Sequence, residues 1–258
     1  MIEVTWGSAS DRGRVRPVNE DSLLASPTLF VVADGMGGHA AGDVASQLAV
    51  DGLTQLLDSD PIGVPEVLEA IDEANLSIVN RAAASEERAG MGTTIAGVAV
   101  VEVGGIDHWM VFNMGDSRVY RMIDDELIQV TVDHSEAQEM VASGQLTLEE
   151  ARTYRRRNVV TRSLGIDPPD AVDTWVFPPV PGERFLLCSD GLTTEVDEGA
   201  IRTFLERIDD PQEAAQVLVR AAIDAGGSDN VTVVVIDHRA TDASDVDENT
   251  VPRRIGGA

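Results

Sequence analysis

The chain has 258 residues, which is long enough for one large domain with a substantial buried core. It carries 45 acidic residues against 19 basic ones, all of them arginine, and its formal net charge is −26. This excess of acid argues against binding to nucleic acid or to an anionic membrane surface, because both require basic patches.

The first clear strand of the chain ends on an acid. The run LFVVAD, residues 29–34, closes on Asp34, and glycines then stand at positions 35, 37, 38 and 42. A glycine-rich turn after a strand is typical of a phosphate-binding loop, a metal site or a simple tight turn. Helical periodicity follows over residues 43–57 and 66–84.

The middle of the chain is rich in strands. The predicted strands are residues 93–103, 108–114, 118–123 and 126–132. We expect the second and third of these to form a hairpin around the triplet Gly115-Asp116-Ser117, and Asp124-Asp125 to turn the chain into the fourth. Because these turns are too short for crossover helices, the pairing is expected to be antiparallel.

The second half of the chain returns to helices and then closes on strands. Two short helices are expected, over residues 135–144 and 147–157, and a longer one over 211–226. Further strands are expected at 184–189 and 231–237, whereas residues 239–258 lack periodicity and are expected to be a disordered tail. The segregation of strands and helices predicts an α+β fold.

Acids recur beside the most apolar strands. Besides Asp34, they are Asp116, Asp190 and Asp229, with Glu20 and Asp21 before the first strand. Each alone fits ordinary turn chemistry. Several carboxylates that converge from different strand ends would instead require a divalent cation such as Mg²⁺ or Mn²⁺. Arg16 lies five residues before Asp21 and is suited to bidentate capture of a phosphate.

Eight short motifs occur in one order along the chain. They are RPVNED (16–21), VADGMGGH (32–39), GTT (92–94), MGDSR (114–118), DHS (133–135), RSLG (162–165), SDGL (189–192) and SDNVT (228–232). Together they resemble the metal-dependent PPM/PP2C-type serine/threonine phosphatase family, particularly its compact bacterial members, from about Trp6 to Asp237. The resemblance implies a four-layer α/β/β/α sandwich with two antiparallel sheets packed face to face. The catalytic domain would be residues 1–238, with a flap inserted at 134–164.

The resemblance also implies roles for individual residues. The implied metal-binding residues are Glu20, Asp21, Asp34, Gly35, Asp116, Asp190 and Asp229, and the implied catalytic residues are Arg16, Asp34, Asp190 and Asp229. Two Mn²⁺ or Mg²⁺ ions would share a hydroxide that attacks phosphoserine or phosphothreonine directly, while Arg16 binds the phosphate. Asp116 and Asp190 would bind a third, weaker ion.

Two positions depart from the family pattern. Met36 stands where some members carry a general-acid histidine, and His39 follows as either that proton donor or a loop histidine. Thr194 stands where some members have a further metal-binding acid, which leaves occupancy of the third metal site open.

Other functions fit the sequence less well. Gly35 to Ala40 fits the dinucleotide pattern G-x-G-x-x-A, but no acid ends a second strand about 20 residues later. A P-loop nucleotide site needs a lysine, and the chain has none. A cysteine phosphatase needs an arginine six residues after its cysteine, whereas the residue six after Cys188 is Thr194. A pseudophosphatase that binds phosphoproteins remains the alternative. We expect a cytoplasmic monomer that acts on proteins phosphorylated by Ser/Thr kinases, without nucleic-acid or membrane partners.

Overall fold

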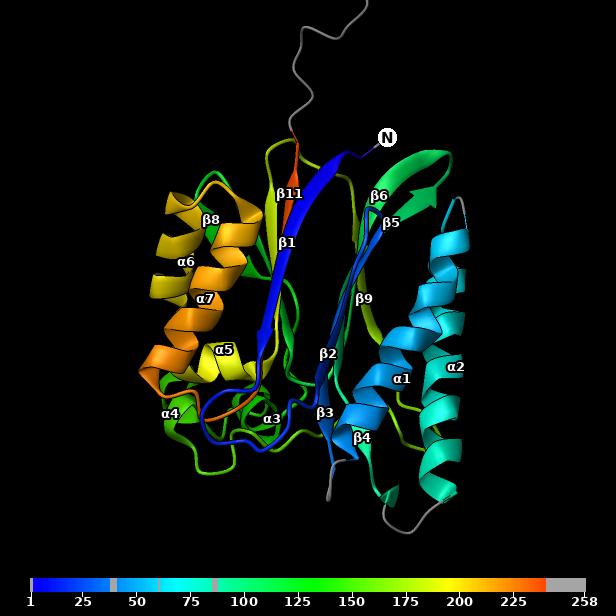
Figure 1. Ribbon diagram of the computed structural model, residues 1–258, viewed down its shortest axis with the longest axis vertical. Helices are drawn as coiled ribbons and strands as arrows, with labels where there is room; N and C mark the ends of the chain where they lie inside the picture. Colours follow the sequence, from blue (N-terminus) through cyan, green and yellow to red (C-terminus); the bar gives the residue numbers. More distant parts are fainter. Residues whose placement is uncertain (1, 38–40, 60, 85–87, 240–258) are drawn as a thin grey trace, which may run out of the picture.

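The strands form two antiparallel sheets that face each other, in a computed structural model that describes residues 2–37, 41–59, 61–84 and 88–239 (Figure 1). The first sheet contains, in spatial order, β1 (Val4–Asp11), β11 (Val231–His238), β10 (Arg184–Cys188), β7 (Arg118–Ile123) and β8 (Glu126–Gln129). The second contains β2 (Asp21–Ala25), β3 (Leu29–Met36), β5 (Ile95–Val103), β6 (Ile106–Met114) and β9 (Asp173–Phe177), and β4 (Gly92–Thr93) pairs with β3.

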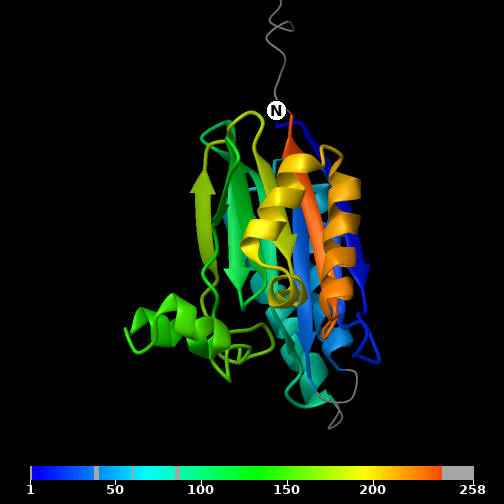
Figure 2. The same ribbon diagram turned by 90° about the vertical axis from the view of Figure 1, so that its left-hand side faces the viewer.

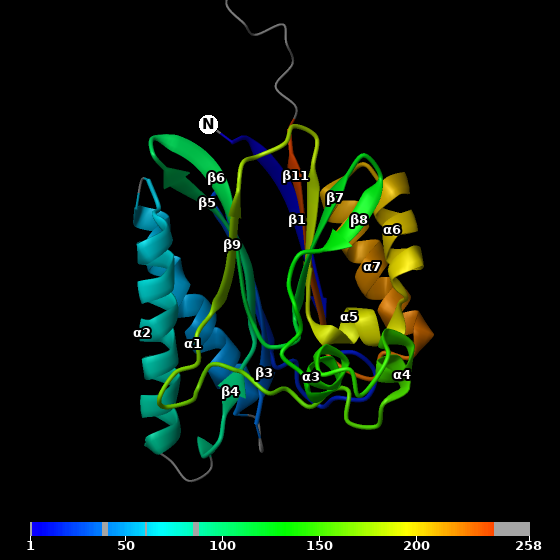
Figure 3. The same ribbon diagram turned by 180° about the vertical axis from the view of Figure 1, so that it is seen from behind.

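Helices cover the outer face of each sheet. The second sheet is covered by α1 (Gly42–Thr54) and α2 (Val64–Ala83), with the short 3-10 helix η1 (Gln55–Asp58) between them. The first sheet is covered by α5 (Asp190–Glu195), α6 (Glu198–Arg207) and α7 (Pro211–Ala225) (Figure 3). The predicted α/β/β/α architecture is therefore confirmed.

Two short helices stand apart from these layers. They are α3 (Glu136–Ala142) and α4 (Leu148–Thr153), and they project from one end of the sandwich (Figure 2). The predicted second helix, 147–157, is too long, because the backbone becomes extended at Tyr154. A capping box between Thr147 and Glu150 fixes its start.

The core explains why β3 is apolar without interruption. Leu29, Val31 and Ala33 pack in the core beneath α1 and α2, whereas Phe30 and Val32 pack in the core between the two sheets. Because successive side chains of a strand point to opposite faces, a central strand of a four-layer sandwich is buried on both sides. Its register therefore fixes Asp34 at the end of the buried run.

The predicted hairpin over 108–123 is wrong. β6 pairs with β5 on one edge and β9 on the other, while β7 lies in the opposite sheet between β10 and β8. Both edges of β6 are occupied, so β7 has no edge of β6 to pair with. Residues 115–117 instead carry the chain from one sheet to the other, with Gly115 at a φ of 112°. Asp116 consequently lies where the sheets approach each other.

The remaining strand predictions are mostly confirmed. Hairpins form at Gly104-Gly105 and at Asp124-Asp125, where positive φ values suit the two-residue turns that match strand twist. Strands β1, β2 and β9 and helices α5 and α6 have no counterpart among the predicted elements. The predicted tail, 239–258, lies outside the described residues apart from Arg239. No helix within the described ranges is both long and apolar enough to cross a membrane.

Candidate metal centre

The recurring acids gather at one end of the sandwich. Asp34 lies near the end of β3, and Asp21, the first residue of β2, is its direct cross-strand partner. Asp190 opens α5 directly after β10 and Ser189, and Asp229 lies two residues before β11. Asp116 reaches the same region through the crossing turn. The two sheets thus contribute acids to one site.

Glycines let the backbone close in around these acids. The Gly35 amide donates to the Glu20 carbonyl oxygen at 3.2 Å, and the Gly42 amide donates to the Glu20 carboxylate at 3.2 Å. A Cβ atom at Gly35 would lie 2.1 Å from the Gly42 carbonyl oxygen, and one at Gly42 would lie 2.8 Å from the Glu20 carboxylate. Any larger residue at position 35 would therefore force the start of α1 away from β3.

Two threonines hold the backbone of Asp34. The Asp34 amide donates to Thr94 Oγ1 at 3.0 Å, and its carbonyl oxygen accepts from the Thr94 amide and the Thr93 hydroxyl, both at 2.9 Å. No described residue donates a hydrogen bond to the Asp34 carboxylate. Its oxygens are therefore available to a ligand, while the residue that carries them is fixed.

Burial and mutual repulsion raise the pKa values of the acids. Burial is the main cause for each, with neighbouring carboxylates adding to it. The pKa of Asp34 lies well above its usual range, that of Asp21 rises to about 7, that of Asp190 to about 6 and that of Asp116 to about 8. The Asp21 Oδ2 atom accepts from the Ser189 hydroxyl at 2.8 Å, but the buried Oδ1 atom has no partner among the described residues.

These features fit divalent cations with oxygen ligands. Buried like charges are costly unless a cation compensates them, and Mg²⁺ and Mn²⁺ prefer carboxylate, carbonyl and water oxygens. Within the described ranges, no three acidic, histidine or cysteine side chains stand close enough to hold an ion as they are placed. Ions bound there would therefore draw the acids inward or reach them through water.

Arg16 stands at the rim of the acids. It lies in the loop between β1 and β2, its side chain is 47% exposed, and one nitrogen donates to Asp229 Oδ2 at 2.7 Å. Asn230 stabilises this loop through side-chain hydrogen bonds, a role that its sequence motif did not predict. Its side-chain amide donates to the carbonyl oxygens of Arg12 and Val18, both at 2.9 Å, and its Oδ1 accepts from the Glu20 amide.

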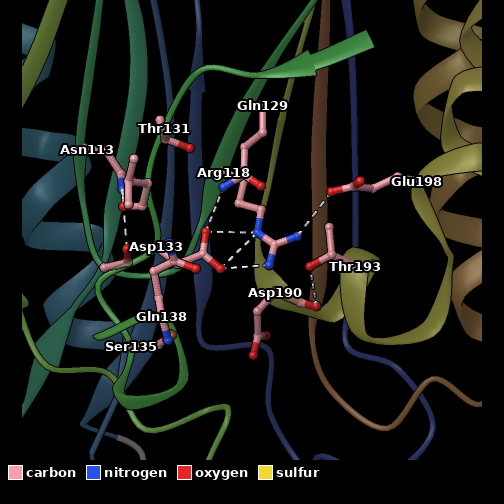
Figure 4. A network of polar contacts seen from close by, with 12 residues as sticks. Asn113, Arg118, Gln129, Thr131, Asp133, Ser135, Gln138, Asp190, Thr193 and Glu198 are labelled. Carbon is pink, nitrogen blue, oxygen red and sulfur yellow. Dashed lines mark hydrogen bonds and ion pairs between the residues drawn. The ribbon is translucent and has the colours of Figure 1, made fainter. Parts of the chain in front are cut away.

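A half-buried ion pair flanks the site on the side of β7. Figure 4 shows Arg118 pointing at Asp133, with Asp190 below it. The Arg118 Nε donates to Asp133 Oδ1 at 2.9 Å and an Nη to Oδ2 at 2.6 Å, while another Nη donates to the Tyr120 hydroxyl at 2.9 Å. The Arg118 charge lowers the pKa values of Asp190 and Asp116, which burial raises. In the sequence, Arg118 is recognisable only as the last residue of the motif MGDSR, which does not indicate its ion pair with Asp133.

The departures from the family pattern concern His39, the candidate proton donor, and Thr194, whose neighbour is Glu195. His39 lies outside the described residues. Glu195, beside the Thr194 that replaces a metal-binding acid in the family pattern, accepts from the Ser228 amide at 2.9 Å and from its hydroxyl at 2.5 Å. Its carboxylate thus braces the loop that carries Asp229, and it is no free substitute for an acid at 194.

The chain is similar in sequence to known protein phosphatases. The family described as protein phosphatase 2C matches residues 17–224. The serine/threonine protein phosphatase PstP of Mycobacterium tuberculosis (strain H37Rv) is 40% identical over 242 residues, which cover 92% of this chain but 45% of that protein. The chain thus spans about half the length of this relative. The serine/threonine phosphatase stp of Listeria innocua is 36% identical over 240 residues, covering 88% of this chain and 93% of that protein.

A solved structure agrees in fold and carries metal. The catalytic domain of the serine/threonine protein phosphatase PstP, in complex with two manganese ions, superposes with a TM-score of 0.85 at 36% sequence identity. The superposition covers 93% of this chain and all of that one. The resemblance suggested by the motifs is confirmed, and the chain belongs to the protein phosphatase 2C family.

Proposed function

We propose that this chain is a metal-dependent protein phosphatase that hydrolyses phosphoserine and phosphothreonine in proteins. The observation that carries the proposal is the gathering of acids with raised pKa values from both sheets near Arg16, in a chain of the protein phosphatase 2C family. Arg16 and Arg118 offset only part of the negative charge of these acids, as expected of a binding site for cations.

Two Mn²⁺ or Mg²⁺ ions would be held by Asp34, Asp190, Asp229 and the Gly35 carbonyl oxygen, with Glu20 and Asp21 acting through water. Asp116 and Asp190 would hold a third, weaker ion. When bound, such ions lower the pKa of a shared water and neutralise phosphoryl oxygens. Because the acids must be ionised to bind, occupancy rises as the pH passes their raised pKa values.

Arg16 would orient the substrate. A guanidinium carries five N–H donors in a planar fork, and the hydrogen bond to Asp229 uses one nitrogen. The other donors can meet two phosphoryl oxygens of a substrate at the half-exposed rim of the site. If Asp229 moved toward a metal ion, the Arg16 nitrogen that donates to it would also become free to bind the substrate. His39 remains the candidate donor of a proton to the leaving oxygen.

The partners follow from this chemistry. We propose phosphoproteins made by Ser/Thr kinases as substrates and a monomeric enzyme. The cytoplasmic location stays a prediction, as does the role of residues 134–164 as a flap beside the substrate.

The test is phosphate release from a phosphothreonine peptide with and without Mn²⁺. We expect metal-dependent turnover by the wild type and a loss of at least 100-fold in Asp190→Asn, since that acid would serve both the two-ion centre and the third site. Asp224→Asn, which removes an exposed acid paired with Arg14, is the matched control and should retain activity. Absence of turnover by the wild type at saturating Mn²⁺ or Mg²⁺ would indicate a phosphoprotein-binding pseudophosphatase instead.

A further inference from the structure

His134 forms two hydrogen bonds with Gly115, the residue before Asp116. Its amide donates to the Gly115 carbonyl oxygen at 2.9 Å, and its ring Nδ1 accepts from the Gly115 amide at 3.0 Å. The histidine is 7% exposed and Gly115 is buried. Water therefore has little access to replace the ring nitrogen as acceptor for the Gly115 amide.

The contacts of the ring fix its tautomer. A backbone amide is always a donor, so Nδ1 carries no proton and a neutral His134 carries it on Nε2. Nε2 lies 3.1 Å from Asp173 Oδ2 and donates to it. Arg162 donates to Asp173 Oδ1 at 3.0 Å, and one of its Nη atoms lies 2.7 Å from Nε2; because both atoms are donors in this tautomer, that contact is not a hydrogen bond. The imidazole and the guanidinium thus share one carboxylate at the start of β9.

The same histidine lies where the two ends of segment 134–164 meet. The Thr161 amide donates to the His134 carbonyl oxygen at 2.9 Å, and Ser135 forms a β-bridge with Val160. At its far end, Leu164 exchanges backbone hydrogen bonds with Thr93, at 2.9 and 3.1 Å. The Thr93 hydroxyl in turn donates to the Asp34 carbonyl oxygen. The segment is therefore anchored to the turn of Asp116 at one end and to Asp34 at the other.

We propose that His134 is a positioning residue for the phosphatase reaction: its Nδ1 fixes the Gly115 amide, and thereby the turn that presents Asp116, to the base of segment 134–164. This inference rests on the proposed function, in which Asp116 binds a metal ion together with Asp190. Gly115 has a left-handed φ of 112° and no side chain, so the backbone alone restrains this turn weakly. The ring restrains the Gly115 amide, in addition to the hydrogen bonds that the Gly115 carbonyl oxygen accepts from the His134 amide and the Asn113 side chain.

The consequence is specific to Asp116. Loss of the Nδ1 acceptor leaves a buried amide without a partner, and the turn then shifts to expose that amide to water. Metal affinity at Asp116 and Asp190 should fall about tenfold, whereas the backbone of Asp34 stays fixed by Thr94. Activity at low Mn²⁺ should fall more than activity at saturating Mn²⁺.

Two substitutions separate this role from simple space filling. The Oδ1 atom of His134→Asn takes the place of Nδ1, whereas His134→Gln places its amide near Nε2 and lacks an acceptor at Nδ1. We would measure hydrogen exchange at the Gly115 amide in the metal-free full-length chain, together with the Mn²⁺ concentration that gives half-maximal turnover. His238→Asn is the matched control, since that buried histidine instead contacts the Val180 carbonyl oxygen at 2.9 Å.

The proposal predicts that His134→Gln accelerates exchange at Gly115 at least tenfold and raises the half-maximal Mn²⁺ concentration about tenfold. His134→Asn should remain within about threefold of the wild type in both, and His238→Asn should change neither. Equal behaviour of the Asn and Gln variants, or unchanged exchange at Gly115 in the Gln variant, would overturn it. Exchange in the metal-free chain does not depend on turnover, so it tests the role of His134 even if the proposed activity fails.

Discussion

Asp21→Asn should make the metal-free protein more stable at alkaline pH. Asp21 has a pKa of 3.8 in an unfolded chain and of about 7 here, because it is buried among other acids. A carboxyl with a raised folded-state pKa costs stability above its unfolded pKa, and the cost grows until the pH reaches the folded-state pKa. At about 1.4 kcal/mol per pH unit, the cost is about 2 kcal/mol at pH 5 and about 4 kcal/mol at pH 8.

The wild type without metal should therefore lose stability as the pH rises from 5 to 8. Asn is neutral throughout, so the variant should be spared about 2 to 3 kcal/mol of this loss, or about 5 to 10 °C in Tm for a chain of this size. The assay is thermal unfolding in a chelator at each pH, with Asp72→Asn, an exposed acid of α2, as control. Added Mn²⁺ should reverse the ranking, because the ionised acid then binds cation.

A gain in stability of the metal-free wild type between pH 5 and pH 8 would contradict this prediction. An equal pH dependence of thermal stability in Asp21→Asn and the wild type would also contradict it, since burial of the Asp21 carboxylate would then cost no stability.

Three further substitutions test other parts of the account. Arg118→Gln should destabilise the protein by about 3 kcal/mol in urea unfolding, because Asp133 would remain partly buried without its ion pair; a change below 1 kcal/mol would contradict this. Arg184→Met should cost about 3 kcal/mol while turnover by the folded enzyme is unchanged, because three carbonyl oxygens in and just after the last turn of α6, and the Asp237 carboxylate, lose their donor. Arg16→Lys should lower kcat/KM for a phosphopeptide about 100-fold through loss of the bidentate fork, and activity within twofold of the wild type would remove Arg16 from the reaction.

Much of the candidate site could be predicted because its signals are local. Asp34 closes an apolar strand and is followed by glycines, and Asp190 repeats this pattern at a second strand. Such acids stand out in sequence since a carboxylate beside a buried run is unusual. Their order along the chain then matched one family, which supplied the metal-binding roles of Glu20 and Asp21.

What could not be predicted depends on distant parts of the chain. The crossing of residues 115–117 between sheets follows from the occupancy of both edges of β6, one of them by β9, about 60 residues later. Strands β1 and β2 are mostly half-buried and mix polar with apolar residues, so their alternation is weak. The contacts of His134 with Gly115 and Asp173 likewise join residues 19 and 39 positions away.

The most direct test of the central claim is anomalous diffraction from crystals of this protein grown with Mn²⁺. The account predicts two strong manganese peaks among Asp34, Asp190 and Asp229, with a weaker one beside Asp116 at high Mn²⁺. Crystals that bind manganese elsewhere, or that leave these carboxylates without an ion at saturating Mn²⁺, would contradict it.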